Sequence, residues 1–425
     1  MRTSAAILLL IPTLAATPLL GGCAHRREHE NGCVVATQLP YVERGNLEPD
    51  PESLPAPNGL EQSLLASPAY YRELNAALVQ CLAASNASLG DLLMREREIN
   101  EPRLAVVSVV RVCHKQQKRA HECILEYSAQ ELQNQASSLA LQAFFNLAEA
   151  EAQLQVADAA SQSLQNVVMQ SRQWKEKGLK LPPDIDNLER QWLDAQTKQA
   201  QLLLSIQELN AQLSQLLNIP YDVETPFWPE ADFSVRGEPI DPELAVQTGM
   251  TYRGDLNVLR CALSTLNETT LPQTRELVRS IHALLGGRSD KEFVREVLAP
   301  LLQILGLSSR ETKMRREQIA TLLNNRERSA AEEIRLAVRK LQIQVHVVDL
   351  ARQHLLKDQA RLAQVQEKEQ KGLASILDRI QVEADWYKAR SNLIHEVMQW
   401  HLDMVKLKQA QGVLPVECTN SPYCK

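Results

Sequence analysis

The segment with the most reactive side chains is CHKQQKRAHEC, at residues 113–123. Cys113, His114, His121 and Cys123 are residue types that bind zinc. On a single helix the two histidines share a face, but the two cysteines lie about 280° apart around the axis. These four ligands could not converge on one ion without a second structural element. We therefore predict no metal site and no metal cofactor.

Cys23 ends an apolar leader. Arg2 precedes the apolar stretch AAILLLIPTLAATPLL at residues 5–20, and Gly21 and Gly22 come directly before Cys23. This layout indicates a secretory signal peptide, and the stretch is short for a membrane-spanning helix. A small-residue cleavage site that ends in cysteine resembles the bacterial lipoprotein box, which implies cleavage before Cys23 and lipid on that residue. The alternative is an ordinary signal peptide with a chance cysteine.

The remaining cysteines would meet an oxidising compartment after export, so they could form disulfides. Cys418 and Cys424 lie in a loop-like C-terminal tail and could pair with each other or with Cys33. Four others lie in helical patterns and are interpreted as small buried apolar residues: Cys81, Cys113, Cys123 and Cys261. The sequence does not give the connectivity.

The chain shows none of the patterns that support catalysis. It has no phosphate-binding glycine loop, no haem-attachment motif and no mark of a hydrolase triad, so we predict no catalytic residue, no cofactor and no enzyme activity. Its net charge of −6 gives no electrostatic footprint for nucleic acid. After the leader no stretch approaches about 18 consecutive apolar residues, so no spanning helix is expected.

The composition favours long helices. Glycine is scarce, at 15 residues, and aromatic residues make up only 4%. A helical pattern runs from about residue 60 to 217 and breaks at KGLKLPPD, residues 177–184. Pro182 and Pro183 cannot continue a helix, so this segment predicts the tip of an αα-hairpin.

The second arm of this hairpin carries residues spaced alternately four and three apart, the pattern of a coiled coil, and the first arm offers a set of apolar residues to pack against it. In the second arm only Gln199 interrupts the apolar set. The second arm offers Leu188, Trp192, Ala195, Gln199, Leu202, Ile206, Leu209, Leu213 and Leu216. The first arm offers Leu139, Ala143, Leu147, Ala150, Leu154 and Ala157.

The same tip occurs again at a shift of 194 residues, in KGLASILDRIQVEADWYKAR from Lys371. The matched pairs are Gly178 and Gly372, Leu179 and Leu373, Asp184 and Asp378, Trp192 and Trp386, Ala195 and Ala389, and Asn218 and Gly412. So many matches at one register, in a chain with few aromatic residues, indicate an internal repeat.

The chain resembles the TolC / outer-membrane efflux protein family in three features. They are the two tandem hairpins with KGL tips, the proline-rich linker and the exported lipoprotein leader. Residues 242–263 are similar to the family's opening stretch, in which an alanine-rich helix runs into Arg-Pro-Asp-Leu; here it is Arg253-Gly254-Asp255-Leu256. The resemblance implies a homotrimeric helical tube across the periplasm, whose tips meet a periplasmic adaptor (membrane-fusion protein) and an inner-membrane pump.

The resemblance also implies roles for individual residues. The adaptor-facing tips would be Gly178, Leu179, Gly372 and Leu373. Asp378 would match the family's aspartate at the periplasmic aperture, where three carboxylates would favour cations. The alternative role for Asp378 is that of a helix N-cap, as for Asp184.

The sequence departs from the family where members insert a β-hairpin in each repeat, which together form a membrane barrel. Strands of this kind are weak or absent here. Residues 104–112 are β-branched but do not alternate, and residues 267–328 indicate a helical insert. Its apolar face, residues 294–307, would either lie in the membrane interface or pack on a neighbouring helix.

These observations predict an all-α chain of long antiparallel coiled-coil hairpins in two tandem repeats. The segments are a signal peptide (1–22), a lipidated tether (23–58), the first repeat (59–217), a linker (218–243), the second repeat (244–412) and a tail (413–425). The expected function is the duct component of a tripartite efflux or type I secretion system, lipid-anchored at the periplasmic face of the outer membrane. The alternative is a non-conducting lipid-anchored scaffold.

Overall fold

The structure is a computed structural model that carries side chains. It describes residues 41–42, 70–99, 108–177, 185–235, 237, 239–281 and 309–419. The predicted lipidation site Cys23, the first tip (Gly178 and Leu179), Cys424 and the apolar stretch 294–307 lie outside the described residues.

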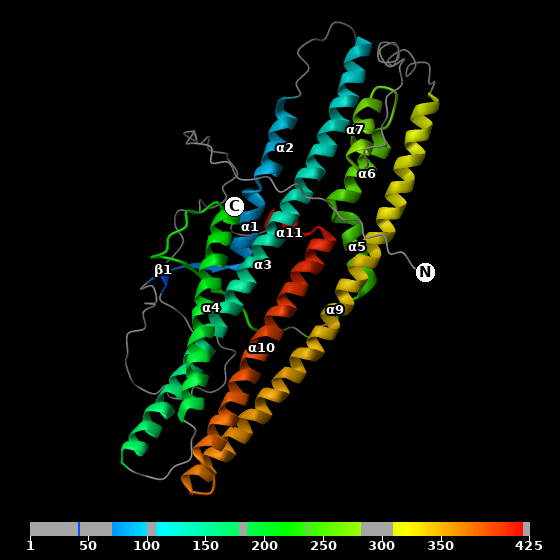
Figure 1. Ribbon diagram of the computed structural model, residues 1–425. Helices are drawn as coiled ribbons and strands as arrows, with labels where there is room; N and C mark the ends of the chain where they lie inside the picture. The colour runs from blue at the N-terminus through cyan, green and yellow to red at the C-terminus, as the bar shows by residue number, and fades with distance from the viewer. Residues whose placement is uncertain are drawn as a thin grey trace, which may run out of the picture.

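Two long helical hairpins dominate the described part of the chain (Figure 1). Helices α3 (Ser108–Glu176) and α4 (Ile185–Leu217) form the first, and α9 (Arg310–Gln370) and α10 (Ile376–Gln411) form the second. Helix α3 packs along α10, so the hairpins lie side by side with their tips at the same end. The predicted helical fold with two hairpins is confirmed.

The predicted seam of α4 faces the protein at all nine positions. From Leu188 to Leu216 every seam residue is buried or half-buried, whereas Leu193 and Leu204, which lie off the seam, are more than half exposed. The polar seam residue Gln199 donates from Nε2 to Asp158 Oδ1 on α3 at 2.8 Å. This hydrogen bond satisfies the amide inside an otherwise apolar contact.

Helix α3 departs from its predicted seam at Leu139, which is 51% exposed. The two helices run antiparallel, as the ion pair between Arg172 and Glu189 near the tip shows. That register carries Leu139 past the point where α4 ends, at Leu217. The prediction for Leu139 is wrong because its partner helix stops first.

The two repeats end in the same backbone conformation. Helix α4 is followed by Asn218 with φ of 53°, and α10 by Gly412 with φ of 73°. Both values lie in the left-handed region that commonly closes a helix. The match of Asn218 with Gly412 as the two helix ends is therefore confirmed.

A small sheet crosses the middle of the molecule, so the described part of the chain is not wholly α-helical. Its strand order is β1 (Tyr41–Val42), β2 (Tyr71–Asn75) and β3 (Phe227–Glu230). Strands β1 and β2 are antiparallel, whereas β2 and β3 are parallel. Two predicted connecting segments, the tether and the linker, therefore each contribute a strand to the folded body.

Short helices pack around the sheet and the long helices. Helix α1 lies against α3, α5 against α9, α6 against α3, and α11 against α1. They are α1 (Ala76–Ser85), α2 (Ser88–Ile99), α5 (Pro242–Tyr252), α6 (Gly254–Thr265), α7 (Leu271–Ile281) and α11 (Leu414–Thr419).

The described parts of the expected insert are helical. Residues 271–281 form α7, and residues 310–328 begin α9. In the first repeat, residues 108–112 already belong to α3. Of the described helices, none alone combines the length and apolarity of a membrane span, although α1 and the first part of α2, bent by 42°, meet those criteria as a pair.

Two disulfides join segments that are distant along the chain. Cys81 on α1 pairs with Cys418 on α11, and Cys123 on α3 pairs with Cys261 on α6. The predicted pairing of Cys418 with Cys424 or Cys33 is therefore wrong. So is the interpretation of Cys81, Cys123 and Cys261 as free buried thiols.

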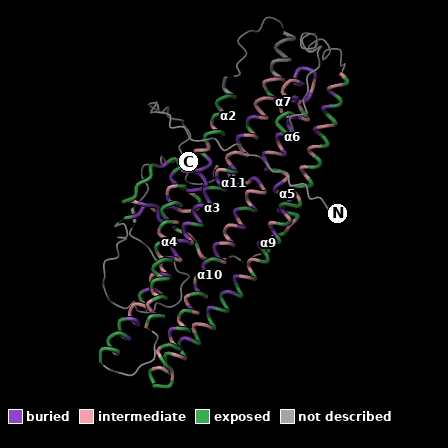
Figure 2. Tube along the Cα trace, viewed as in Figure 1, coloured by how far each residue is buried: buried purple, intermediate pink, exposed green. Residues whose placement is uncertain are grey.

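The buried core follows the contact between the hairpins. Figure 2 shows burial concentrated where α3, α4 and α10 meet around the sheet, with mostly exposed residues towards the tips. Phe144, Leu147 and Leu213 are fully buried there. The two hairpins thus share a core near the sheet, and their tips extend beyond it.

Candidate functional site

The tip of the second hairpin is a compact turn with defined hydrogen bonds. Gly372 has φ of 70°, its N–H donates to the Glu369 carbonyl at 2.9 Å, and the N–H of Leu373 donates to the Lys368 carbonyl at 2.8 Å. This pair of bonds is the Schellman motif, which needs a residue tolerant of the left-handed conformation. The Leu373 side chain is left 75% exposed.

Asp378 closes the turn from the other side. Ser375 caps α10 by accepting a hydrogen bond from the Asp378 N–H at 3.2 Å, and Asp378 Oδ2 accepts from the Ser375 N–H at 3.0 Å. This is a capping box. The Ser375 hydroxyl and N–H lower the pKa of Asp378. The helix-start role is therefore present, although Ser375 is the N-cap and Asp378 the third helical residue.

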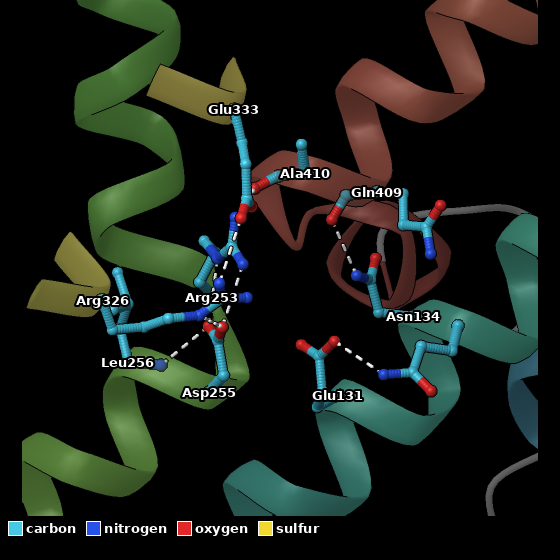
Figure 3. A network of polar contacts seen from close by, with 10 residues as sticks. Glu131, Asn134, Arg253, Asp255, Leu256, Arg326, Glu333, Gln409 and Ala410 are labelled. Atoms are coloured by element: carbon cyan, nitrogen blue, oxygen red, sulfur yellow. Dashed lines mark hydrogen bonds and ion pairs between the residues drawn. The ribbon is translucent and has the colours of Figure 1, made fainter. Parts of the chain in front are cut away.

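A second candidate site is the polar network around Arg253, where α5 meets α6 (Figure 3). Arg253 is 6% exposed and holds Asp255 through two hydrogen bonds, of 3.0 and 2.9 Å. Its Nη1 also donates to Glu333 on α9 at 2.8 Å and to the Ala410 carbonyl near the end of α10 at 3.1 Å. One guanidinium thus joins four helices.

Arg326 completes this network from α9. It donates to Asp255 at 2.7 Å and to Glu333 at 3.0 Å. Burial opposes ionisation of Asp255, but hydrogen bonds and charge from Arg253 and Arg326 outweigh it and lower the pKa of Asp255. The pKa of Arg253 is raised by Asp255 and Glu333 despite its burial. Both groups are therefore held in their charged forms.

A polar cavity of about 350 Å³ lies beside the network. Glu131 lines it from α3, and burial raises the pKa of this carboxyl, while a hydrogen bond from Gln135 partly offsets the effect. Close packing sets the distance from α3 to α6, because a Cβ on Gly254 would lie 2.6 Å from the Tyr127 carbonyl oxygen. The network around Arg253 therefore has the features of a structural contact that holds neighbouring helices together.

A larger groove, of about 810 Å³, lies between the two hairpins on the tip side of the core. Two polar contacts cross it from α3 to α10. Ser163 donates to Glu383 at 2.6 Å, and His395 Nδ1 lies 2.8 Å from Glu149 Oε1. Burial and the Glu383 carboxylate raise the pKa of Tyr387. The groove is lined by small and polar side chains, and these do not form a cluster of reactive groups that point towards one position.

The CHKQQKRAHEC segment lies on α3. Cys123 is bonded to Cys261 and so cannot bind a metal as a thiolate. Among the described residues no three His, Cys, Asp or Glu side chains lie close enough to share a metal ion.

No protein-family model matches the chain, and no curated protein matches it. Solved structures do. The Campylobacter jejuni CmeC outer membrane channel is 13% identical, with a TM-score of 0.58 over 87% of this chain and 95% of that one. The fold is that of the TolC-family outer-membrane channels. The Neisseria gonorrhoeae MtrE outer membrane channel is 12% identical, with a TM-score of 0.56 over 79% of this chain and 88% of that one. CusC, at 13% identity, gives a TM-score of 0.54 over 79% and 90%.

Within this TolC-like fold, sequence reasoning found Arg253 and Asp255 but missed their partners. Glu333 and Arg326 lie 80 and 73 residues from Arg253 along the chain, and no local pattern links them to it. Ser375 carried a signal, since serine three residues before an acidic residue is the sequence mark of a capping box. The second tip and the network are placed by the structure at opposite ends of α10.

Proposed function

We propose that this chain is the outer-membrane-side duct of a tripartite efflux or type I secretion system. It acts as a homotrimer, carries substrates across the periplasm and catalyses no reaction of its own. Lipid on Cys23 holds it at the periplasmic face of the bacterial outer membrane. A periplasmic adaptor and an inner-membrane pump are its partners.

The observation that carries this proposal is the extent of the structural likeness. The TM-score of 0.58 extends over 87% of this chain and 95% of the CmeC channel, so the likeness reaches beyond the coiled-coil hairpins. A scaffold that had kept only its coiled coils would have no need of the remaining body. The two-fold repeat of hairpins also suits a closed tube built from few subunits.

Exposed apolar residues on the long helices support self-association. Leu336, Ile343 and Leu350 are spaced seven residues apart on α9, and their side chains are 55%, 65% and 43% exposed. On α4, Leu193 and Leu204 are also more than half exposed. Heptad spacing on an outer face is the pattern by which one helix packs against another. A second copy of the chain is the natural partner for these faces.

The tips support an adaptor contact. Leu373 presents an exposed apolar side chain on a Schellman turn. The internal repeat predicts an equivalent tip at Gly178 and Leu179, which lie outside the described residues. Asp378, next to this turn, would contribute one carboxylate per subunit to the periplasmic aperture. Its charge is retained at neutral pH, since its pKa is lowered.

Single-channel conductance of the purified, lipidated protein in a planar bilayer tests the proposal. Discrete openings from a preparation that light scattering shows to be trimeric support the duct. A silent bilayer with a protein that fails to bind any adaptor would instead favour the non-conducting scaffold. A monomer at micromolar concentration would contradict both the duct and the assembly on which it depends.

A further inference from the structure

The end of the molecule opposite the hairpin tips carries a group of basic side chains. Lys118 and Arg119 lie on α3, and Arg310, Lys313 and Arg316 lie in the first two turns of α9. All but Lys118 are exposed. We call these five residues the basic collar. Figure 1 shows the start of α9 and the early part of α3 at this end.

Hydrogen bonds through the turn between α6 and α7 hold the two halves of the collar at one level. Gln117 on α3 donates to the Thr269 carbonyl at 2.6 Å. Glu268, the residue before it, accepts from the Ser309 N–H at 2.5 Å and from the Thr312 hydroxyl at 2.7 Å at the start of α9. The two basic segments therefore lie on either side of one turn.

Most acidic groups near the collar are already engaged. Glu268 caps α9, Glu311 pairs with Arg275 at 2.7 Å, and Glu122 lies 3.8 Å from Lys118. In the first two turns of α9, Glu317 is the exposed acidic residue against three exposed cations. Among the described residues, this end is thus locally basic in a chain whose net charge is −6.

The length of the N-terminal tether places a membrane within reach of the collar. Tyr41 is fixed in the sheet, so the 18 residues from Cys23 span at most roughly 60 Å. The sheet packs on α3 at Ala152. From Ala152 to Lys118 the helix rises about 51 Å. A lipid on Cys23 can therefore reach the level of the collar.

We propose that the basic collar is a membrane-binding surface that recognises the anionic headgroups of a phospholipid bilayer. The tether argument rests on the proposed lipidation of Cys23, whereas the charge argument does not. Exposed guanidinium and ammonium groups bind phosphate without burial, and each cation near an anionic surface adds to the affinity. The collar then orients the bundle, with its tips pointing away from the membrane.

A chain that begins at Ala24 tests the collar without the leader or lipid, and it retains every described residue. Its binding would be measured by flotation with vesicles of phosphatidylglycerol and phosphatidylcholine, and with vesicles of phosphatidylcholine alone. Three exposed collar residues are neutralised together in R119Q/R310Q/K313Q. The matched control, R328Q/K340Q/K357Q, removes three exposed cations further along α9.

Binding is expected only to the anionic vesicles and should weaken as salt rises. The collar variant should lose about a hundredfold in affinity, and the control variant less than about threefold. Equal losses in both variants, equal binding to both vesicle types, or no binding would overturn the proposal. None of these results depends on conductance, so a failure here is distinguishable from a failure of the proposed duct.

Discussion

Arg253 Nη1 lies 2.8 Å from Glu333 Oε2, a contact between residues 80 positions apart. The same guanidinium also donates to Asp255 and to the Ala410 carbonyl. It therefore connects the start of the second repeat to its middle and to its end. Replacing Arg253 would leave Asp255 and Glu333 with Arg326 as their remaining cation and would remove the donor to the Ala410 carbonyl.

Arg253→Met should therefore destabilise the fold by about 3 kcal/mol, because one partner of a buried ion pair is removed. Urea unfolding followed by circular dichroism measures this. Arg335→Met is the matched control, since Arg335 pairs with Glu243 and Glu332 at the surface. An equal loss in both variants would show that the buried network contributes no more to the free energy of unfolding than a surface ion pair does.

The pKa of Asp255 predicts acid sensitivity. Because its folded pKa lies below the ordinary value near 3.9, its contribution is present above that value and is lost as pH falls through the folded pKa. The unfolding midpoint of the native chain should therefore fall as the pH drops below about 4. Asp255→Asn should start from a lower midpoint and show a smaller decrease over the same range. Parallel pH profiles would contradict this prediction.

The disulfide between Cys81 and Cys418 closes a loop of 337 residues. By the loop-entropy model, the C81A/C418A double variant should lose on the order of 6 kcal/mol under oxidising conditions. Because reduction also breaks Cys123–Cys261, the native chain and the variant should show similar stability only when both are reduced. Peptide mapping of the unreduced protein provides the structural check, and a Cys418–Cys424 peptide would contradict the pairing.

Ile343 is 65% exposed on α9 and has no packing role in the described monomer. Ile343→Glu should convert the proposed trimer to monomer while helicity and unfolding midpoint remain close to those of the native chain, since a charge in a heptad seam opposes association. Light scattering measures the mass. Lys340→Glu, one turn away, is the control and should leave the trimer intact.

Leu373→Glu tests the second tip. The Schellman hydrogen bonds come from the backbone, so the turn should survive, while an apolar adaptor contact would be lost. Binding to the cognate adaptor should fall at least tenfold in biolayer interferometry. Leu356→Glu, which changes an exposed leucine on α9 away from the tip, should bind normally.

The helices could be predicted because their signals are local. The spacing that identified the seam from Leu188 to Leu216 depends only on which side of a helix each residue occupies. The prediction that Leu139 is buried was wrong because its burial depends on where the partner helix ends. That end point is set by the whole hairpin and not by the residues around Leu139. The position of the second tip, at Gly372, could be predicted from the internal repeat, because finding a repeat requires only a comparison of the chain with itself.

Features that join distant segments could not be predicted. Strand β1 has two residues, and β2 pairs with β3 across more than 150 positions, so neither has a pattern of its own. The partners of Arg253 and of Cys81 likewise lie on other elements, and only the packed fold brings them together. The long helices could therefore be located from the sequence, whereas the contacts that hold them together could not.

Both disulfides join the chain before the first hairpin tip to the chain after it, which gives the folded chain a closed covalent topology. A protease that cut once between Lys177 and Ile185 would produce two fragments, with Cys81 and Cys123 in one and Cys261 and Cys418 in the other. These fragments would migrate as one species until a reductant was added. The hairpins can therefore suffer a backbone break without release of either half.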